Sequence, residues 1–264
     1  MLGTGWTQVV ALLAAFVIAV VASPAGISGA ALLLPFQVSV LGTPSPAVTP
    51  TNLLYNVVAT PGAIYRYWRQ GQTGGCLTRL LVAGTLPGVV AGSIIRVELL
   101  PGARVFDLVV GAVLTPLAGW IAVSRPSPQA KSAQPGYQIP SFALVVVSAA
   151  VGCVGGIYGI GGGSILAPVL IGGGQPPSEV APAALASTFV TSIAGVITFT
   201  TLSIHQHLHV APDWLTGIAL GIGGLAGAYT GARIQARLPD LLIRRVMGIL
   251  VLAIGIRYLV LGAS

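Results

Sequence analysis

The sequence predicts an all-α, polytopic integral membrane protein made of two inverted repeats. Three observations support this prediction: very few charges, long consecutive apolar segments, and two halves that resemble each other. Only 6% of the 264 residues are charged and 55% are hydrophobic, whereas soluble domains carry about 25% charged residues. This composition excludes a soluble enzyme, a nucleic-acid-binding domain and a disordered chain. The net charge of +7 is better explained by membrane topology than by a nucleic-acid partner.

Ten apolar segments follow one another along the chain, and a polar linker divides them into two groups of five. They lie at 6–23, 28–41, 48–66, 76–95, 104–123, 139–157, 161–172, 180–200, 213–232 and 241–260. We expect a first membrane repeat over 1–123, a cytoplasmic linker over 124–138 and a second membrane repeat over 139–264. The first segment is expected to be a membrane helix and not a signal peptide, because no Lys or Arg precedes Arg66.

Two of these segments, 28–41 and 161–172, are too short to cross a membrane, which takes about 20 residues. Each follows a glycine-rich break inside a longer apolar run, here called the first break (residues 24–30) and the second break (residues 155–164). Glycine permits the positive φ that a turn within the membrane needs. Each half is therefore expected to contain a broken or re-entrant helical hairpin plus three transmembrane helices.

Short motifs recur in the same order in the two halves. Gly26–Pro35 matches Gly159–Pro168 at an offset of 133, and Val48–Pro50 matches Val180–Pro182 at an offset of 132. Later matches at offsets of 138 and 137 are Leu100-Pro101 with Leu238-Pro239 and Gly111 with Gly248. Because biased composition does not easily produce four matches in order, the halves are interpreted as repeats.

Basic residues mark three cytoplasmic regions by the positive-inside rule. These are the loop around 67–75, the central linker and the loop between the last two segments, which together hold nine of the 12 Lys and Arg residues. The last inter-helix loop of the first half then faces outside, whereas its repeat partner faces inside. The repeats are therefore expected to be inverted, and inverted repeats with broken helices are a recurrent architecture of secondary transporters.

The two breaks are the expected place for a ligand. A helix that begins at a break has unpaired N–H donors and about half a positive charge at its N-terminus. Two such ends would suit an oxyanion. The alternative is that the glycines only allow close helix packing. The positions expected to bind substrate are Ser28, Gly29, Ala30, Gly161, Gly162, Gly163 and Ser164.

Polar side chains on the helices that follow the hairpins complete the expected site. Asn52 and Asn56 are four residues apart and share one helix face. The equivalent part of the second half carries Ser187 and Thr188. Hydrogen bonding between helices is the alternative role for all four side chains. Gln37 in the first short segment is a further candidate.

The charged residues favour an anionic substrate over a cationic one. No Asp or Glu lies at the centre of an apolar segment, which argues against a cation pathway lined by carboxylates. A buried arginine could add positive charge to the site, and Arg79 is the nearest candidate. Snorkelling of Arg79 to the cytoplasmic side is the simpler interpretation.

The histidines at 205, 207 and 209 form the sharpest polar cluster and could bind zinc or nickel. By the predicted topology they lie in an external loop, where a solvated loop is the simpler interpretation. Permeation of a transition metal through these histidines is an alternative function, and a membrane enzyme or structural partner subunit is a third. Cys76 and Cys153 are expected to be free thiols, and no cofactor is expected.

The chain resembles the sulfite exporter TauE/SafE family of permeases, also called the toluene sulfonate uptake permease family. The resemblance lies in Gly159–Leu170, in the following Ala186-Ser187-Thr188 and in the basic Arg233–Arg245 loop, with Gly26–Pro35 as a weaker first-half copy. It implies a permease of the inner membrane that moves sulfite, an organosulfonate or a similar sulfur oxyanion. Its partners would be this small anion and the lipid bilayer, and a homodimer is left open.

Overall fold

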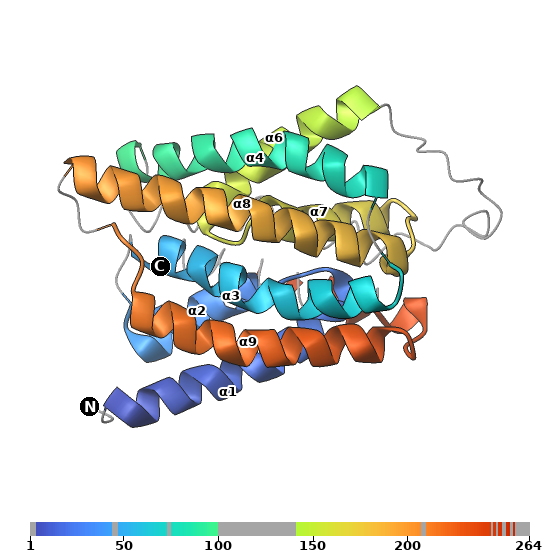
Figure 1. Cartoon of the computed structure of the whole chain (residues 1–264), viewed down its shortest axis with the longest axis horizontal. Coiled ribbons are helices and arrows are strands. Elements are labelled where there is room, and N and C mark those ends of the chain that lie inside the picture. The colour runs from blue at the N-terminus through green and yellow to red at the C-terminus, as the bar shows by residue number, and fades with distance from the viewer. Residues whose placement is uncertain are drawn as a thin grey trace.

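The computed structural model describes residues 4–43, 47–72, 75–99, 141–206 and 210–243, together with a few positions between 245 and 256. These residues form helices and no strands. The predicted linker over 124–138 and the predicted segment 104–123 lie outside the described residues. The long helices lie roughly along one common axis, and the chain runs along it in both directions (Figure 1).

The first half begins with α1 (Thr4–Ala22), a short 3₁₀ turn η1 (Ser23–Ala25) and the short helix α2 (Ala30–Phe36). A π-helical turn η2 (Gln37–Leu41) extends α2, and α3 (Val48–Arg69) and α4 (Gly75–Glu98) follow. The second half contains α6 (Ser141–Tyr158), the short helix α7 (Gly162–Gly172), α8 (Pro177–Gln206) and α9 (Trp214–Gln235). The predicted interruptions of the apolar segments at the two breaks are confirmed.

Four of the described helices are long and apolar enough to cross a membrane. They cover Trp6–Ala25, Gly75–Glu98, Pro177–His205 and Trp214–Gln235. The long helices hold prolines such as Pro61, Pro87 and Pro182 in their interiors, which membrane helices tolerate when neighbours satisfy the freed carbonyls. The N-terminus of α9 is capped by Asp213, whose carboxylate accepts a hydrogen bond from the Thr216 backbone N–H at 3.1 Å.

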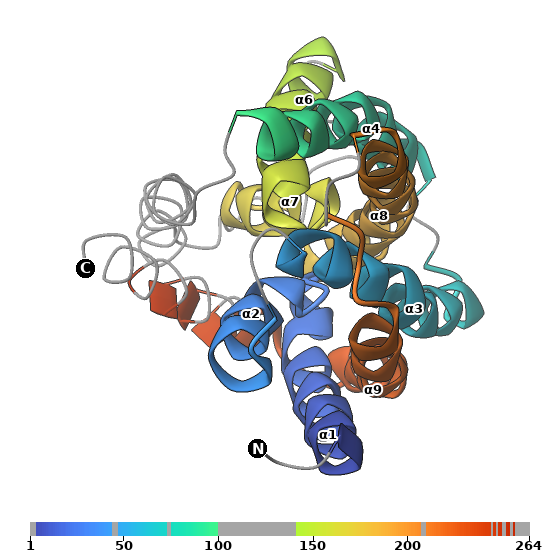
Figure 2. The same ribbon diagram turned by 90° about the vertical axis from the view of Figure 1, so that its left-hand side faces the viewer.

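The order of the helices across the molecule interleaves the two halves. In the end-on view α4 and α6 lie at one side, α1 and α9 lie at the other, and α3, α7 and α8 lie between them (Figure 2). In Figure 1 α1, α3 and α9 run from left to right, whereas α6, α8 and α4 run from right to left. The helices α1, α3 and α9 therefore point in the direction opposite to α4, α6 and α8.

Two glycine seams join the halves. On α4, Gly84, Gly88 and Gly92 pack so closely on α6 that a Cβ at any of them would lie under 3.0 Å from the carbonyl oxygen of Val145, Ala149 or Cys153, respectively. On α9, Gly223, Gly227 and Gly231 meet the carbonyl oxygens of Leu12, Phe16 and Val20 on α1 in the same way. Small residues every fourth position allow this close backbone approach.

The residues that pair in one seam are related to those that pair in the other by constant sequence offsets. The α9 glycines lie 139 positions after the α4 glycines, and the α6 carbonyls lie 133 positions after the α1 carbonyls. One seam thus packs α4 of the first half against α6 of the second, and the other packs α9 of the second half against α1 of the first. The residues of both breaks are buried.

Candidate functional site

Each break is built from glycines in the left-handed region, as the sequence predicts. Gly26 and Gly29 have φ values of 77° and 85°, and Gly159 and Gly161 have φ values of 74° and 72°. Side chains other than glycine rarely adopt this conformation. Gly29 caps the N-terminus of α2 and Gly161 caps that of α7. The two short helices therefore start directly from the two breaks.

A chain of hydroxyl groups joins the breaks to each other. The backbone N–H of Ser28 donates to Ser164 Oγ at 3.2 Å, and Ser164 Oγ donates to Ser28 Oγ at 3.0 Å. Ser164 Oγ also lies within 3.1 Å of Thr188 Oγ1 on α8. The N-terminal ends of α2 and α7 consequently meet at one buried point, where their N–H groups and dipoles add.

Side chains of α3 hold the first break in place. Tyr55 donates its hydroxyl to the Ser28 carbonyl oxygen at 2.6 Å. Asn52 Nδ2 donates to the Ala30 carbonyl at 2.9 Å, and Asn52 Oδ1 accepts from Gln37 Nε2 at 2.9 Å. Because both ends of its amide are used, Asn52 fastens α2 to α3.

Asn56, one helical turn after Asn52, is also buried, but its side-chain amide lacks the hydrogen bonds that Asn52 forms. Neither Nδ2 nor Oδ1 of Asn56 has a hydrogen-bond partner among the described residues, and the side chain is fully buried. Ser192 on α8 is likewise buried with an unpartnered hydroxyl, which would lie 3.1 Å from a Cβ placed at Gly161. Buried polar groups are normally hydrogen-bonded, so both side chains have hydrogen-bonding capacity that no described group uses.

All eleven residues expected at the site are buried. Ser28, Gly29, Ala30, Gly161, Gly162, Gly163, Ser164 and Thr188 gather at the meeting point of the breaks. Ser187 points to another helix, where its hydroxyl lies 2.9 Å from Thr85 Oγ1 of α4. Sequence reasoning did not select Thr85 or Ser192 for the site. No motif marks them, since single hydroxyl residues are common in apolar helices.

Arg79, the arginine suggested by sequence, is exposed near the start of α4. Arg96, near the other end of α4, is fully buried and is among the largest fully buried side chains of the described residues. Exposure of Arg79 agrees with the simpler interpretation, in which its side chain snorkels, and the alternative of a buried Arg79 at the site is wrong. The sequence signal for Arg96 was its place four residues after Gly92, which continues the four-residue spacing of Gly84, Gly88 and Gly92, a spacing typical of a buried helix face.

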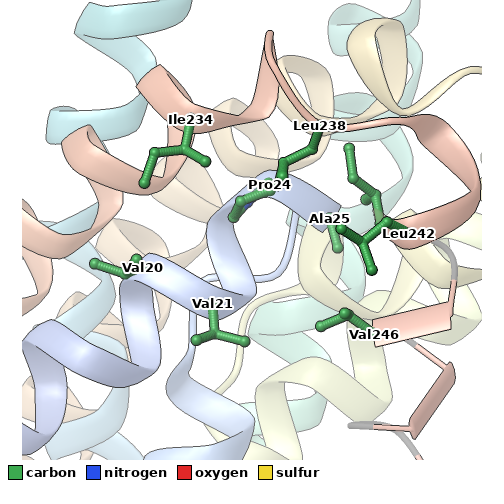
Figure 3. A pocket seen from close by; sticks show the side chains of 9 residues that line it. Val20, Val21, Pro24, Ala25, Ile234, Leu238, Leu242 and Val246 are labelled. Carbon is green, nitrogen blue, oxygen red and sulfur yellow. The ribbon is translucent and has the colours of Figure 1, made fainter.

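A cavity of about 210 Å³ lies beside the first break but does not suit an anion. Its wall consists of apolar side chains from α1, η1, the end of α9 and the residues that follow (Figure 3). Pro24 and Ala25 of the first break line it together with Ile234 and Leu238. With no polar side chain in its lining, the cavity offers an anion no hydrogen-bond donor.

The two cysteines and the histidine cluster are the remaining features predicted from the sequence. Both cysteines are free, Cys76 being exposed and Cys153 half-buried. Of the histidine cluster, His205 is exposed at the end of α8, and residues 207–209 lie outside the described residues. Among the described residues, no three or more His, Cys, Asp or Glu side chains cluster closely enough to hold a metal ion.

Apolar helices of membrane-spanning length, two breaks and a buried polar site define a multi-pass protein of the cell membrane with the features of a transporter. The chain belongs to the Sulfite exporter TauE/SafE family, whose sequence profile matches residues 11–258. A probable membrane transporter protein, YunE of Bacillus subtilis (strain 168), is 29% identical over 120 residues. That match covers 45% of this chain and 41% of the relative. No solved structure matches the chain significantly.

Proposed function

We propose that this protein is a secondary transporter that exports sulfite, or a related sulfur oxyanion or organosulfonate, across the inner membrane. The anion binds at the N-termini of α2 and α7 where the two breaks meet. The observation that carries the proposal is the pair of hydrogen bonds between Ser28 and Ser164, which joins two helix N-termini from different halves at one buried point. The family name supports a sulfur compound as the substrate, and the relative's name supports membrane transport.

The distribution of charge supports an anion as substrate. The four described carboxylates, on Glu98, Glu179, Asp213 and Asp240, are all exposed, so none of them opposes an anion at the buried site. A negative-inside membrane potential favours the exit of an anion by about 2.3 kcal/mol per charge per 100 mV. Export therefore requires no internal carboxylate.

Alternating access between two inverted repeats, over 1–123 and 139–264, would move the anion across. The opposite directions of α3 and α8 and of α4 and α9 support this arrangement. The arginine-bearing ends of α3 and α9 and the start of α4 lie at the same side of the molecule (Figure 1). This agrees with a single cytoplasmic side under the positive-inside rule.

Sulfite flux in proteoliposomes tests the proposal, first with an imposed potential and then with an imposed pH gradient. Flux that follows the potential supports uncoupled anion export, and flux that requires the pH gradient indicates a protonated substrate or a titrating group. Gly162→Leu should insert normally but carry no flux, because a Cβ at this position already comes under 3.0 Å from Thr85. Normal flux in this variant would overturn the site, and absence of flux for every oxyanion in the wild type would overturn the function.

Permeation of a transition metal through the histidines at 205, 207 and 209 is the second candidate function. The measurement that separates the two is flux after replacement of all three histidines with alanine. Loss of zinc or nickel flux with anion flux intact would establish the metal pathway. Flux of neither ion in the wild type would favour a membrane enzyme or partner subunit.

A further inference from the structure

Ser192 on α8 has a buried hydroxyl group that no described residue bonds. The side chain is fully buried, and its Oγ has no hydrogen-bond partner among the described residues. A hydroxyl group in an apolar helix can bond the carbonyl oxygen four residues before it, as Thr191 Oγ1 does with the Ser187 carbonyl at 2.8 Å. Because Ser192 does not do this, its O–H donor and both acceptor lone pairs remain available in the interior.

The Ser192 hydroxyl lies at the N-terminus of α7. Its Oγ would be 3.1 Å from a Cβ placed at Gly161, which is the N-cap of that helix. Thr188, one turn earlier on α8, lies against the same residue, since its Cγ2 would be 2.8 Å from that Cβ. Thr188 Oγ1, however, lies within 3.1 Å of Ser164 Oγ. The helix α8 thus presents two hydroxyl groups to the start of α7, and of these two the Ser192 hydroxyl has no described partner.

The N-terminus of α7 itself favours an anion. The first four backbone N–H groups of an α-helix have no partner within the helix, and the N-cap Gly161 has no side chain that could accept hydrogen bonds from them. The aligned peptide dipoles add about half a positive charge at this end. The described carboxylates are all exposed, so none of them neutralises it. A hydroxyl donor beside such N–H groups suits the oxygens of an oxyanion.

We propose that Ser192 contacts the transported oxyanion, its hydroxyl donating to one oxygen while N–H groups at the start of α7 bind another. The inference rests on the proposed function and adds to it a residue that no sequence motif marks. A Cβ at Gly161 would already crowd Ser192 Oγ at 3.1 Å, so no anion fits between these two residues in this structure. The helices α7 and α8 must therefore separate for binding, as one repeat moves against the other during alternating access.

The first experiment compares sulfite flux of Ser192→Ala, Ser148→Ala and the wild type in proteoliposomes. Ser148→Ala is the matched control, because Ser148 Oγ is also buried and without a described partner but lies on α6, where the side chain packs against Gly84 of α4. We expect Ser192→Ala to raise the half-saturating sulfite concentration about tenfold, as for loss of a hydrogen bond to a charged group. Ser148→Ala should match the wild type. An unchanged value in Ser192→Ala, or an equal rise in both variants, would overturn the role.

Thermal unfolding in detergent, with and without sulfite, separates a substrate contact from a structural role. Without sulfite, Ser192→Ala should melt at the wild-type temperature, because its hydroxyl has no described partner to lose. Sulfite should raise the melting temperature of the wild type and of Ser148→Ala, and that of Ser192→Ala by less. A lower melting temperature without sulfite, together with the full response to sulfite, would show a structural partner and overturn the role. If Ser192→Ala does not insert, Ser192→Cys, which keeps the size but donates weakly, decides by the same measurements.

The outcomes also distinguish this inference from the proposed function. Wild-type flux of sulfite with no change in Ser192→Ala would leave the proposed function standing and remove the role of Ser192. Absence of wild-type flux for sulfite and for methanesulfonate, a small organosulfonate, together with no thermal stabilisation by either anion, would overturn both.

Discussion

Ser28 and Ser164 are 136 positions apart in the chain, yet the backbone N–H of Ser28 and the hydroxyl of Ser164 are hydrogen-bonded at 3.2 Å. A second bond joins their hydroxyl groups at 3.0 Å. This pair is a direct contact between the two broken helices, and it lies where both helix dipoles present their positive ends. A substrate anion at this point would compete with, or add to, these bonds, so changes to the pair should affect both stability and transport.

Ser164→Ala should destabilise the protein by about 1–3 kcal/mol, because it leaves the buried Ser28 N–H without its acceptor. In a double-mutant cycle with Ser28→Ala, measured by thermal unfolding in detergent, the interaction free energy between the two serines should be about 0.5–3 kcal/mol. Ser192→Ala is the control, since the Ser192 hydroxyl has no described partner to lose. Equal stability of Ser164→Ala and Ser192→Ala would contradict the assigned bonds.

Asn52→Leu and Asn56→Leu should have opposite effects although the residues are one turn apart. Asn52→Leu removes the partners of Gln37 and of the Ala30 carbonyl and should cost about 1–3 kcal/mol. Asn56→Leu removes an amide without partners, so stability should be unchanged or higher while sulfite affinity falls. Thermal unfolding and flux measured on both variants check this, and wild-type affinity in Asn56→Leu would remove Asn56 from the site.

Gly159→Ala should abolish transport, whereas Gly71→Ala should be tolerated. Both glycines have a φ of 74°, so each substitution carries backbone strain of about 1–2 kcal/mol. They differ in space: a Cβ at Gly159 would meet the Thr49 backbone under 3.0 Å, and nothing lies within 4 Å at Gly71. Flux and melting temperature of the two variants isolate the packing contribution, and equal losses in both would show that strain alone matters.

Gly88→Ala and Gly227→Ala should destabilise the protein by similar amounts, of about 1–3 kcal/mol each. Both are central glycines of the two seams, and both face a carbonyl oxygen of the neighbouring helix. Ala91→Val adds bulk to α4 at an exposed position and should stay within about 0.5 kcal/mol of the wild type. A large effect at only one glycine would contradict the equivalence of the seams. The measurement is unfolding in detergent.

Much of the helical architecture could be predicted from the sequence because it depends on local properties. Apolar segments of about 20 residues form membrane helices wherever they pack, and the predicted segment 48–66 became α3 over Val48–Arg69. The breaks were equally predictable, since glycines such as Gly29 and Gly161 adopt a backbone conformation that other residues avoid. The offset of 133 between Gly26 and Gly159 is the sequence signal on which the proposed repeat rests.

Only the tertiary structure decided which polar side chains have hydrogen-bond partners and which arginine is buried. Asn52 and Asn56 look equivalent on a helix face, but only Asn52 meets Gln37 and Ala30. Arg79 and Arg96 are arginines of one helix, and only the packing of α4 against α6 places Arg96 inside. The physical reason is that local sequence fixes where a helix begins and ends, whereas burial and hydrogen bonding depend on the neighbour that each face meets.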